Sequence, residues 1–232
     1  MDMIATGVRP EIVFLRDDAE GRELVMRIPE QVPVRFAVSG VVDSLSDVPH
    51  PQGIVAVVPM DAIHSEPSFD VWPDDLILVA DGVRDPGNLG TLIRTAAGAG
   101  VTEVIVTPDS VDPFNPKCVR SAMGAHFLTP IRQMTREELV DYLANVPLIA
   151  MAEADGNLAY DEPDWTDACA IIVGSEAFGA NPVIRELANA YVRIPLSRDL
   201  ESLNAGVAGS HVVLEAARQR RSSARFENPV RD

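Results

Sequence analysis

The chain has 232 residues, 47% of them apolar, and a formal net charge of −16 at pH 7. This length and apolar content predict one large globular domain, or a small domain together with a medium one. No run approaches roughly 18 uninterrupted apolar residues, which argues against a membrane-spanning helix. The strong acidity argues against a protein whose whole surface binds nucleic acid. No secretory signal is visible at the start, and two cysteines are too few for a disulfide framework, so we expect a cytoplasmic protein.

The first 60 residues are expected to form a small α/β unit. Strands are predicted at residues 11–15, 32–38 and 53–58, and a helix at 17–27, from apolar and β-branched runs bounded by Pro and Gly. Asp17 or Asp18 can cap that helix. Residues 61–73 combine prolines, serines and acids with little periodicity, which is typical of a linker.

Beyond the linker, residues 74–232 alternate between short apolar strands and helices. This alternation predicts an α/β domain with a mostly parallel sheet and helices on both of its faces. Thr135 and Glu138 have the spacing of a capping box at one helix start. The strands are expected at 75–80, 103–107, 127–131, 146–152, 168–173 and 191–194, and the helices at 89–99, 116–123, 135–144, 182–189 and 203–221.

A glycine loop, GSEAFG at 174–179, follows one predicted strand and precedes a helix. Its glycines have the spacing with which a P-loop begins, but Ala180 and Asn181 stand where that loop requires Lys and Ser or Thr. A tight turn at the strand end remains an alternative, and such a turn is also where ligands bind in open α/β folds. Glu176 can cap the next helix or pair with an arginine, or it can point into a ligand site.

A second loop rich in Gly and Pro, at 81–90, leads into the helix expected at 89–99. Asn88 can cap this helix or contribute a polar group to a site. Arg94 lies among small and apolar helix residues, where its head group either reaches solvent or points into a site.

Two stretches are basic within the acidic chain. Residues 114–136 hold Lys117 and three arginines with no acid, and residues 216–231 hold five arginines against Glu227 alone. They are either solvated helix faces or surfaces that meet phosphates. The four histidines have no spacing typical of a catalytic triad or a zinc site, so no metal site is expected.

Three motifs, taken in this order, resemble the SpoU (TrmH-like) branch of the knotted SPOUT methyltransferases. They are NLGTLIRTA at 88–96, VGSEAFG at 173–179, and IPL at 194–196 followed by SLN at 202–204. NPKCVR at 115–120 resembles a further stretch of the family. The resemblance is strong over 74–221 and weak over 11–60. One departure is Ala205-Gly206, where the family usually has Val-Ser.

The resemblance implies a deep trefoil knot and an enzyme that transfers a methyl group from S-adenosyl-L-methionine to a ribose 2′-oxygen of RNA. The residues implied in catalysis are Arg94, Asn88, Glu176, Ser202 and Asn204. Those implied in cofactor binding are Gly174, Ile194, Pro195, Leu203, Ala152 and Ala208. Lys117 and Arg120 are implied in RNA binding, with surface solvation as the alternative.

Arg94 is often given the role of the base in this family. A guanidinium resists deprotonation, so a bidentate clamp on an RNA phosphate is the physically easier role.

The partners implied by the resemblance are RNA and a second copy of the chain, with no membrane and no metal. Ribosomal RNA is favoured over transfer RNA because the tRNA-specific members lack the N-terminal unit, which resembles a substrate-binding domain. Two alternatives stay open for this unit, which is either truncated or has its true start upstream of Met1. A tRNA 2′-O-methyltransferase, a non-catalytic knotted module that binds RNA or the donor, and an unrelated α/β enzyme remain as alternatives.

Overall fold

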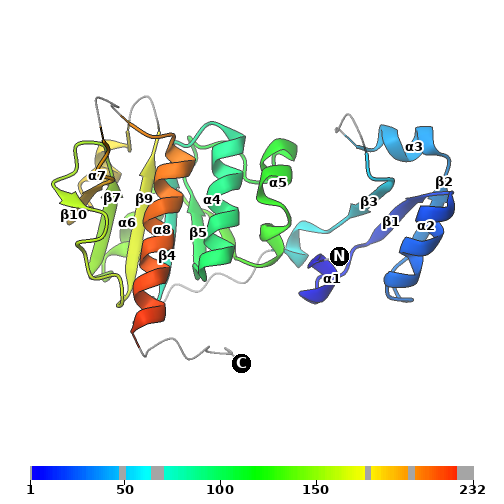
Figure 1. Cartoon of the computed structure of the whole chain (residues 1–232), viewed down its shortest axis with the longest axis horizontal. Coiled ribbons are helices and arrows are strands. Elements are labelled where there is room, and N and C mark those ends of the chain that lie inside the picture. Colours follow the sequence, from blue (N-terminus) through cyan, green and yellow to red (C-terminus); the bar gives the residue numbers. More distant parts are fainter. Residues whose placement is uncertain (1, 47–50, 64–70, 176–178, 198–201, 224–232) are drawn as a thin grey trace. The chain divides into compact units, whose positions relative to one another are not determined.

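The chain forms two compact units, Met1–Ser65 and Glu66–Asp232, each with its own sheet (Figure 1). The computed structural model describes residues 2–46, 51–63, 71–175, 179–197 and 202–223.

The first unit is a three-stranded sheet with short helices, in agreement with the predicted small α/β unit. The central strand β1 pairs in parallel with β2 and antiparallel with β3. The carboxylate of Asp18 caps α2 by accepting a hydrogen bond from the backbone N–H of Gly21 at 2.8 Å. The elements are α1 Asp2–Ala5, β1 Ile12–Arg16, α2 Ala19–Leu24, η1 Val25–Arg27, β2 Val34–Ala37, α3 Ser39–Ser44, β3 Ile54–Val57 and η2 Met60–Ala62. The sequence did not predict α3.

The described part of the second unit forms a seven-stranded sheet in the order β6-β5-β4-β9-β7-β10-β8, and every pair is parallel. The strands are β4 Leu76–Asp81, β5 Glu103–Val106, β6 Ile131–Gln133, β7 Leu148–Ala152, β8 Leu158–Ala159, β9 Cys169–Gly174 and β10 Ala190–Arg193. The central strands β4 and β9 are apolar along their length because both of their faces are covered.

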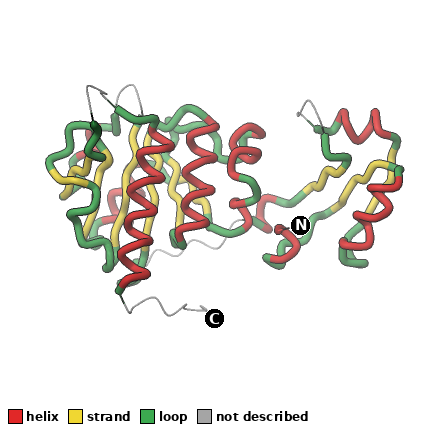
Figure 2. The backbone as a smooth tube through the Cα atoms, viewed as in Figure 1, coloured by secondary structure: helices red, strands yellow, loops and turns green. Residues whose placement is uncertain are grey.

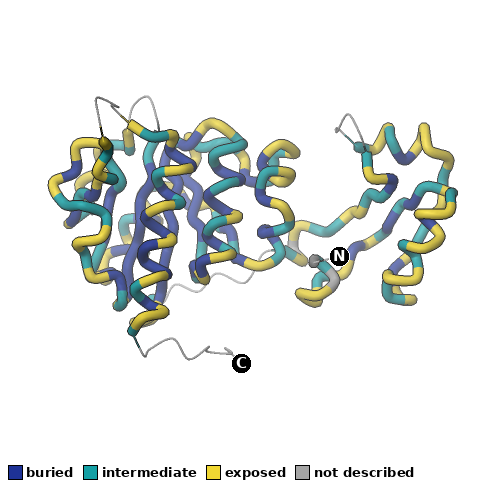
Figure 3. The backbone as a smooth tube through the Cα atoms, viewed as in Figure 1, coloured by how far each residue is buried: buried dark blue, intermediate teal, exposed yellow. Residues whose placement is uncertain are grey.

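Helices cover both faces of this sheet, as predicted (Figure 2). Leu76, Leu78 and Ala80 of β4 belong to a core shared with α4, α5 and α8, whereas Ile77 and Val79 belong to a second core shared with α6 and α7. Figure 3 shows the strands buried between helices whose outer sides are exposed. The helices are α4 Pro86–Ala99, α5 Pro116–Ala122, η3 Ala125–Phe127, α6 Arg136–Leu143, α7 Pro182–Arg185 and α8 Ala205–Ser222.

Most expected elements occur within a few residues of their predicted bounds, two differ more, and one strand was not expected. Residues 127–131 were predicted as one strand, but η3 ends at Phe127 and β6 begins at Ile131. The short strand β8 was not predicted. The predicted helix at 182–189 ends as an α-helix at Arg185. The capping box of Thr135 and Glu138 is confirmed at the start of α6.

None of the helices in the described residues is long and apolar enough to cross a membrane. The trefoil knot implied by the resemblance stays a prediction.

Candidate active site

A cavity of about 340 Å³ opens at the carboxyl ends of β7, β9 and β10 in the second unit. This is the sheet edge at which open α/β folds bind their ligands. The residues that line it are Ala152, Glu153, Ala154, Asp155, Val173, Gly174, Ser175, Gly179, Ala180, Arg185, Val192, Ile194, Leu196, Ser202, Leu203, Ala205, Ala208 and Val212.

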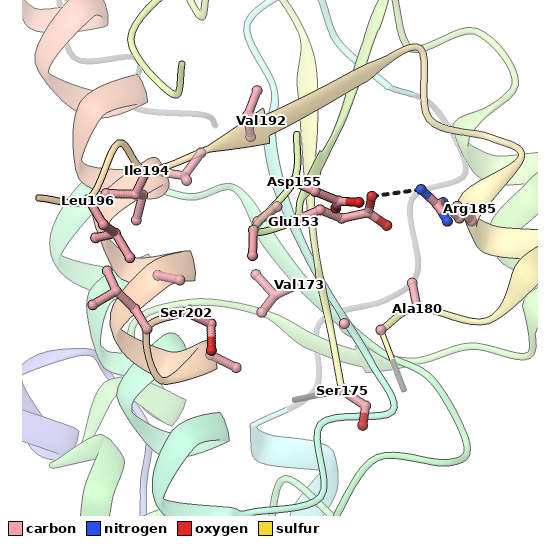
Figure 4. Close-up of a pocket in the computed structure, with 18 residues that line it drawn as sticks. Glu153, Asp155, Val173, Ser175, Ala180, Arg185, Val192, Ile194, Leu196 and Ser202 are labelled. Atoms are coloured by element: carbon pink, nitrogen blue, oxygen red, sulfur yellow. Dashed lines mark hydrogen bonds and ion pairs between the residues drawn. The ribbon is translucent and has the colours of Figure 1, made fainter. Parts of the chain in front are cut away.

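The lining is mostly small or apolar, with a few polar side chains. In Figure 4, Ile194, Leu196 and Ser202 lie on the opposite side of the view from Arg185, and the side chains of Glu153 and Asp155 lie between them. Small residues leave room for a ligand close to the backbone, and the apolar wall suits a flat ring. A few convergent polar groups in an otherwise apolar pocket are typical of small-molecule sites.

The glycine loop forms one edge of the cavity through a close backbone turn. A Cβ atom at Gly174 would lie 2.5 Å from the nitrogen of Ala180 and 2.6 Å from the carbonyl carbon of Gly179. Ser175 and Gly179 exchange two backbone hydrogen bonds, of 3.0 and 2.9 Å. Only glycine at position 174 therefore allows the chain to return this closely after β9. Glu176, expected in this loop, lies outside the described residues.

A buried carboxylate holds the end of this loop against the sheet. Asp81, the last residue of β4, is 1% exposed and accepts a hydrogen bond from the backbone N–H of Asn181 at 2.6 Å. It also accepts a hydrogen bond from the hydroxyl of Thr107 at 2.8 Å and lies 3.4 Å from a guanidinium nitrogen of Arg136. These donors compensate the cost of burying the charge and fix the position at which α7 begins.

Asn88 and Asn204 meet where α4 and α8 begin. The amide nitrogen of Asn204 donates a hydrogen bond to the side-chain oxygen of Asn88 at 2.9 Å, and the Asn204 oxygen caps α8 by accepting from the N–H of Val207. Asp85, not Asn88, caps α4, so the helix begins three residues earlier than predicted. A Cβ atom at Gly206 would lie 3.2 Å from the Cα atom of Asn88. The departure from the family pattern at Gly206 therefore coincides with a close approach of the two helices.

The sequence and the fold both match known methylases. The SpoU rRNA Methylase family model matches residues 75–214. The 23S rRNA (guanosine(2553)-2'-O)-methyltransferase RlmP of Bacillus subtilis is 34% identical over 171 residues, which are 73% of this chain and 66% of that protein. The 23S rRNA (guanosine-2'-O-)-methyltransferase RlmB of Acinetobacter baylyi is 30% identical over an alignment of 216 residues that covers 88% of this chain and 86% of that protein.

Among solved structures, the SpoU methyltransferase AviRb from Streptomyces viridochromogenes, in complex with the cofactor AdoMet, has a TM-score of 0.80 and 26% identity. That match covers 95% of this chain and 86% of AviRb. The chain belongs to the SpoU rRNA methylase family. The fold of this SpoU methylase therefore agrees with the α/β fold that its sequence predicts.

The structure brings together most of the residues predicted to bind the cofactor. Those that line the cavity of this SpoU methylase are Gly174, Ile194, Leu203, Ala152 and Ala208, and Ser202 of the predicted catalytic set lines it as well. Pro195 does not line the cavity, although both of its neighbours in the motif, Ile194 and Leu196, do so.

The other described residues predicted for catalysis and RNA binding are not among those that line the cavity, and they lie on α4, on α5 and at the start of α8. Arg94 is exposed, and its side chain makes no hydrogen bond or ion pair with any residue in the described ranges. The Lys117 ammonium lies 3.3 Å from a carboxylate oxygen of Asp85, the α4 cap. Arg120 is exposed on α5. The basic stretch 114–136 is only partly free to bind phosphates, since Arg132 and Arg136 pair with carboxylates inside the unit.

Sequence reasoning missed the three charged residues that line the cavity: Glu153, Asp155 and Arg185. The signal for the first was its place directly after the strand predicted at 146–152, at the ligand-binding edge of a parallel sheet. The involvement of Arg185 depends on how α7 packs, which no local pattern indicates. In the described part of this SpoU methylase, no group of three or more His, Cys, Asp or Glu residues is arranged to hold a metal ion.

Proposed function

We propose that this chain transfers the methyl group of S-adenosylmethionine to a ribose 2′-oxygen of ribosomal RNA. The observation that carries this proposal is the single cavity that unites residues of the second and third motifs, from Gly174 to Leu203, in a chain of the SpoU family. The relatives RlmP and RlmB are named as 2′-O-methyltransferases of 23S rRNA, which supports the same substrate class here.

The residues of the cavity fit the donor. Val173, Ile194 and Leu196 offer an apolar wall for an adenine ring, and the turn at Gly174 exposes backbone groups at close range. Bound S-adenosylmethionine would supply a methyl group that its positive sulfonium already activates. The protein then has to align the acceptor oxygen with that methyl group and exclude competing orientations.

Arg94 is proposed to position the RNA, since it does not line the donor cavity and has a free, exposed guanidinium. A guanidinium can bind a phosphate through two parallel hydrogen bonds and can stabilise charge that develops on the ribose oxygen. The Asn88–Asn204 hydrogen bond would hold the starts of α4 and α8 in register beside the acceptor, and Ser202 would face both ligands from the cavity rim.

Lys117 and Arg120 are proposed to contact RNA phosphates from α5, the helix packed beside α4. Because the chain is acidic overall, such local positive groups would have to supply the attraction to RNA. The first unit is proposed as the substrate-binding domain, which favours ribosomal over transfer RNA, and the cytoplasm as the location.

We further propose that the protein acts as a homodimer. In support, α5 and α8 lie on the same face of the sheet and carry apolar side chains that are largely exposed in the single chain. These are Val119 at 39%, Met123 at 66%, Val207 at 52% and Leu214 at 49% exposure.

The test of this function uses methyl-labelled S-adenosylmethionine with separated rRNA and tRNA from cells that lack the gene. Wild type should label rRNA, and Arg94→Ala should reduce the rate about a hundredfold or more, as removal of a group that stabilises the transition state does. Because Arg94 lies outside the cavity, the affinity for S-adenosylhomocysteine should not change. Arg94→Lys, which keeps the charge but loses the planar fork, should recover part of the rate.

Labelled tRNA with unlabelled rRNA would show that rRNA is the wrong substrate, while the proposed methyl transfer would stand. No label on either RNA, with donor binding intact, would indicate a non-catalytic module.

A further inference from the structure

Glu153 and Arg185 form the one ion pair among the described residues that line the cavity. The Glu153 carboxylate oxygen Oε2 lies 2.8 Å from a guanidinium nitrogen of Arg185 (Figure 4). The Glu153 side chain is 15% exposed, whereas that of Arg185 is 52% exposed. An ion pair at an exposed site contributes little to stability, so its conformational role at this cavity is the feature of interest.

Both partners are held in place by contacts with β10. The backbone N–H of Glu153 donates a hydrogen bond to the carbonyl of Val192 at 2.9 Å, which fixes the end of β7 against β10. The Arg185 guanidinium lies 5.3 Å from the centre of the Tyr191 ring, and the Tyr191 hydroxyl donates to the Arg185 carbonyl at 3.0 Å. The carboxylate is therefore preorganised before a ligand arrives.

One oxygen of this carboxylate remains available to a ligand. Arg185 occupies Oε2, and no donor within the described residues reaches Oε1. An ionised carboxylate can only accept hydrogen bonds, and its two oxygens provide several lone-pair directions. A ligand that binds here must therefore offer hydrogen-bond donors.

Charge decides which donors suit the site. The guanidinium of Arg185 already offsets the negative charge of Glu153, so a cationic ligand group would be brought close to a second cation. Hydroxyl groups carry no charge and avoid this repulsion. Dinucleotide-binding folds provide a precedent for such a contact. In these folds an acidic residue near the carboxyl ends of the parallel strands binds a ribose hydroxyl.

We propose that Glu153, oriented by Arg185, binds the ribose hydroxyls of the nucleoside ligand in this cavity. This inference rests on the proposed function, because it takes the ligand to be the methyl donor. Glu153 is then a specificity residue that distinguishes a ribonucleoside donor from a deoxyribonucleoside analogue, and Arg185 is a positioning residue that acts through it.

The test measures dissociation constants by calorimetry for S-adenosylhomocysteine and 5′-methylthioadenosine, together with the 2′-deoxy and 3′-deoxy forms of the latter. Glu153→Ala should weaken both parent ligands by about tenfold to a hundredfold, the range for a hydrogen bond to a charged group. In wild type, at least one deoxy form should bind more weakly than 5′-methylthioadenosine. In Glu153→Ala, that deoxy form and 5′-methylthioadenosine should bind equally well. Glu153→Gln, which keeps the shape and one acceptor oxygen, should show a smaller loss.

The chain offers a matched control in Glu103. Its side chain is also 15% exposed and lies 2.6 Å from an arginine, Arg132, but it does not line the cavity. Glu103→Gln should leave every dissociation constant unchanged. Arg185→Gln should lose part of the affinity that Glu153→Ala loses. It should also show a smaller difference than wild type between the deoxy forms and 5′-methylthioadenosine.

Two results would overturn the proposal while leaving the proposed function intact. One is unchanged 5′-methylthioadenosine binding by Glu153→Ala with weakened S-adenosylhomocysteine binding, which would assign the carboxylate to the amino-acid part of the donor. The other is a deoxy penalty that persists in Glu153→Ala. Failure of wild type to bind S-adenosylhomocysteine at all would instead refute the donor site itself, and this inference with it.

Discussion

Arg220 is a buried cation that joins the end of α8 to the start of the sheet. It is 8% exposed, and its guanidinium donates hydrogen bonds to the backbone carbonyls of Trp165, Asp74, Asp75 and Asp167 at 2.6–3.1 Å. One side chain thus satisfies carbonyl groups from two segments far apart in the sequence. Such groups are costly when they are buried without a donor.

Arg220→Met should therefore destabilise the second unit by about 3 kcal/mol or more, because it removes four hydrogen bonds donated by a charged group. The neighbouring Arg221 is exposed, so Arg221→Met should change stability by less than about 0.5 kcal/mol. Urea unfolding followed by circular dichroism measures both. Equal stabilities of the two variants would contradict this role for Arg220.

His126 gives the fold a dependence on pH. The residue is 4% exposed, Nε2 lies 2.8 Å from the carbonyl oxygen of Pro113, and Nδ1 has no partner among the described residues. Burial lowers the pKa of His126, and the hydrogen bond to Pro113 opposes this only in part. The stability that the neutral, buried His126 contributes is present above the unfolded pKa of about 6.5. It is lost as the pH falls through the folded pKa, because the histidine of the unfolded state binds a proton more readily than the buried one.

The free energy of unfolding should consequently fall between about pH 7.5 and pH 5, and it should fall less steeply in His126→Gln. The glutamine amide can still donate to Pro113 but does not titrate. Urea midpoints at several pH values give the two slopes. Parallel slopes would show that other groups account for the dependence.

At the scale of elements, α8 approaches β9 and α4 closely at a glycine. A Cβ atom at Gly209 would lie 2.6 Å from Cγ2 of Val173 and 2.7 Å from Cδ2 of Leu92, both of which are buried side chains. The final helix can therefore pack against the sheet only because position 209 has no side chain.

Gly209→Ala should destabilise the second unit by about 1–3 kcal/mol through overpacking. Gly98 is a helical glycine on α4 with no atom within 4 Å of its added Cβ, so it is the matched control. Gly98→Ala should be neutral or stabilising by up to about 1 kcal/mol, from helix propensity. Thermal unfolding of both variants tests this packing, and a neutral Gly209→Ala would contradict it.

The sequence predicts best those elements that local residue patterns determine, and it predicts poorly those features that depend on tertiary packing. Strands β4 and β9 were predicted well because their uninterrupted apolar residues leave few alternatives, and Gly174 follows from its place at the end of such a strand. The start of α4 was misplaced because Asp85 and Asn88 are both good caps, and the choice of Asp85 with Pro86 in the first turn needs the structure. Glu153–Arg185 joins residues 32 positions apart and depends on tertiary packing alone.

At the scale of the whole molecule, the chain combines a small and a large unit, and the proposed dimer adds a second copy. Val207→Glu on α8 should give a monomer, since it places a charge in the proposed apolar interface. Val183 on α7 is equally exposed, at 52%, but lies on the opposite face of the sheet. Val183→Glu should stay dimeric. Sedimentation velocity measures both masses, and a monomeric wild type would refute the proposed dimer.

We propose above that this SpoU methylase methylates a ribose 2′-oxygen of rRNA. The most direct measurement is mass spectrometry of nucleosides from rRNA treated with the protein and trideuteromethyl-labelled S-adenosylmethionine. We expect a nucleoside with the heavy methyl group on its ribose, at one rRNA position, and we expect this nucleoside to be absent with Arg94→Ala. A heavy methyl group on a base, or none on rRNA from cells that lack the gene, would contradict it.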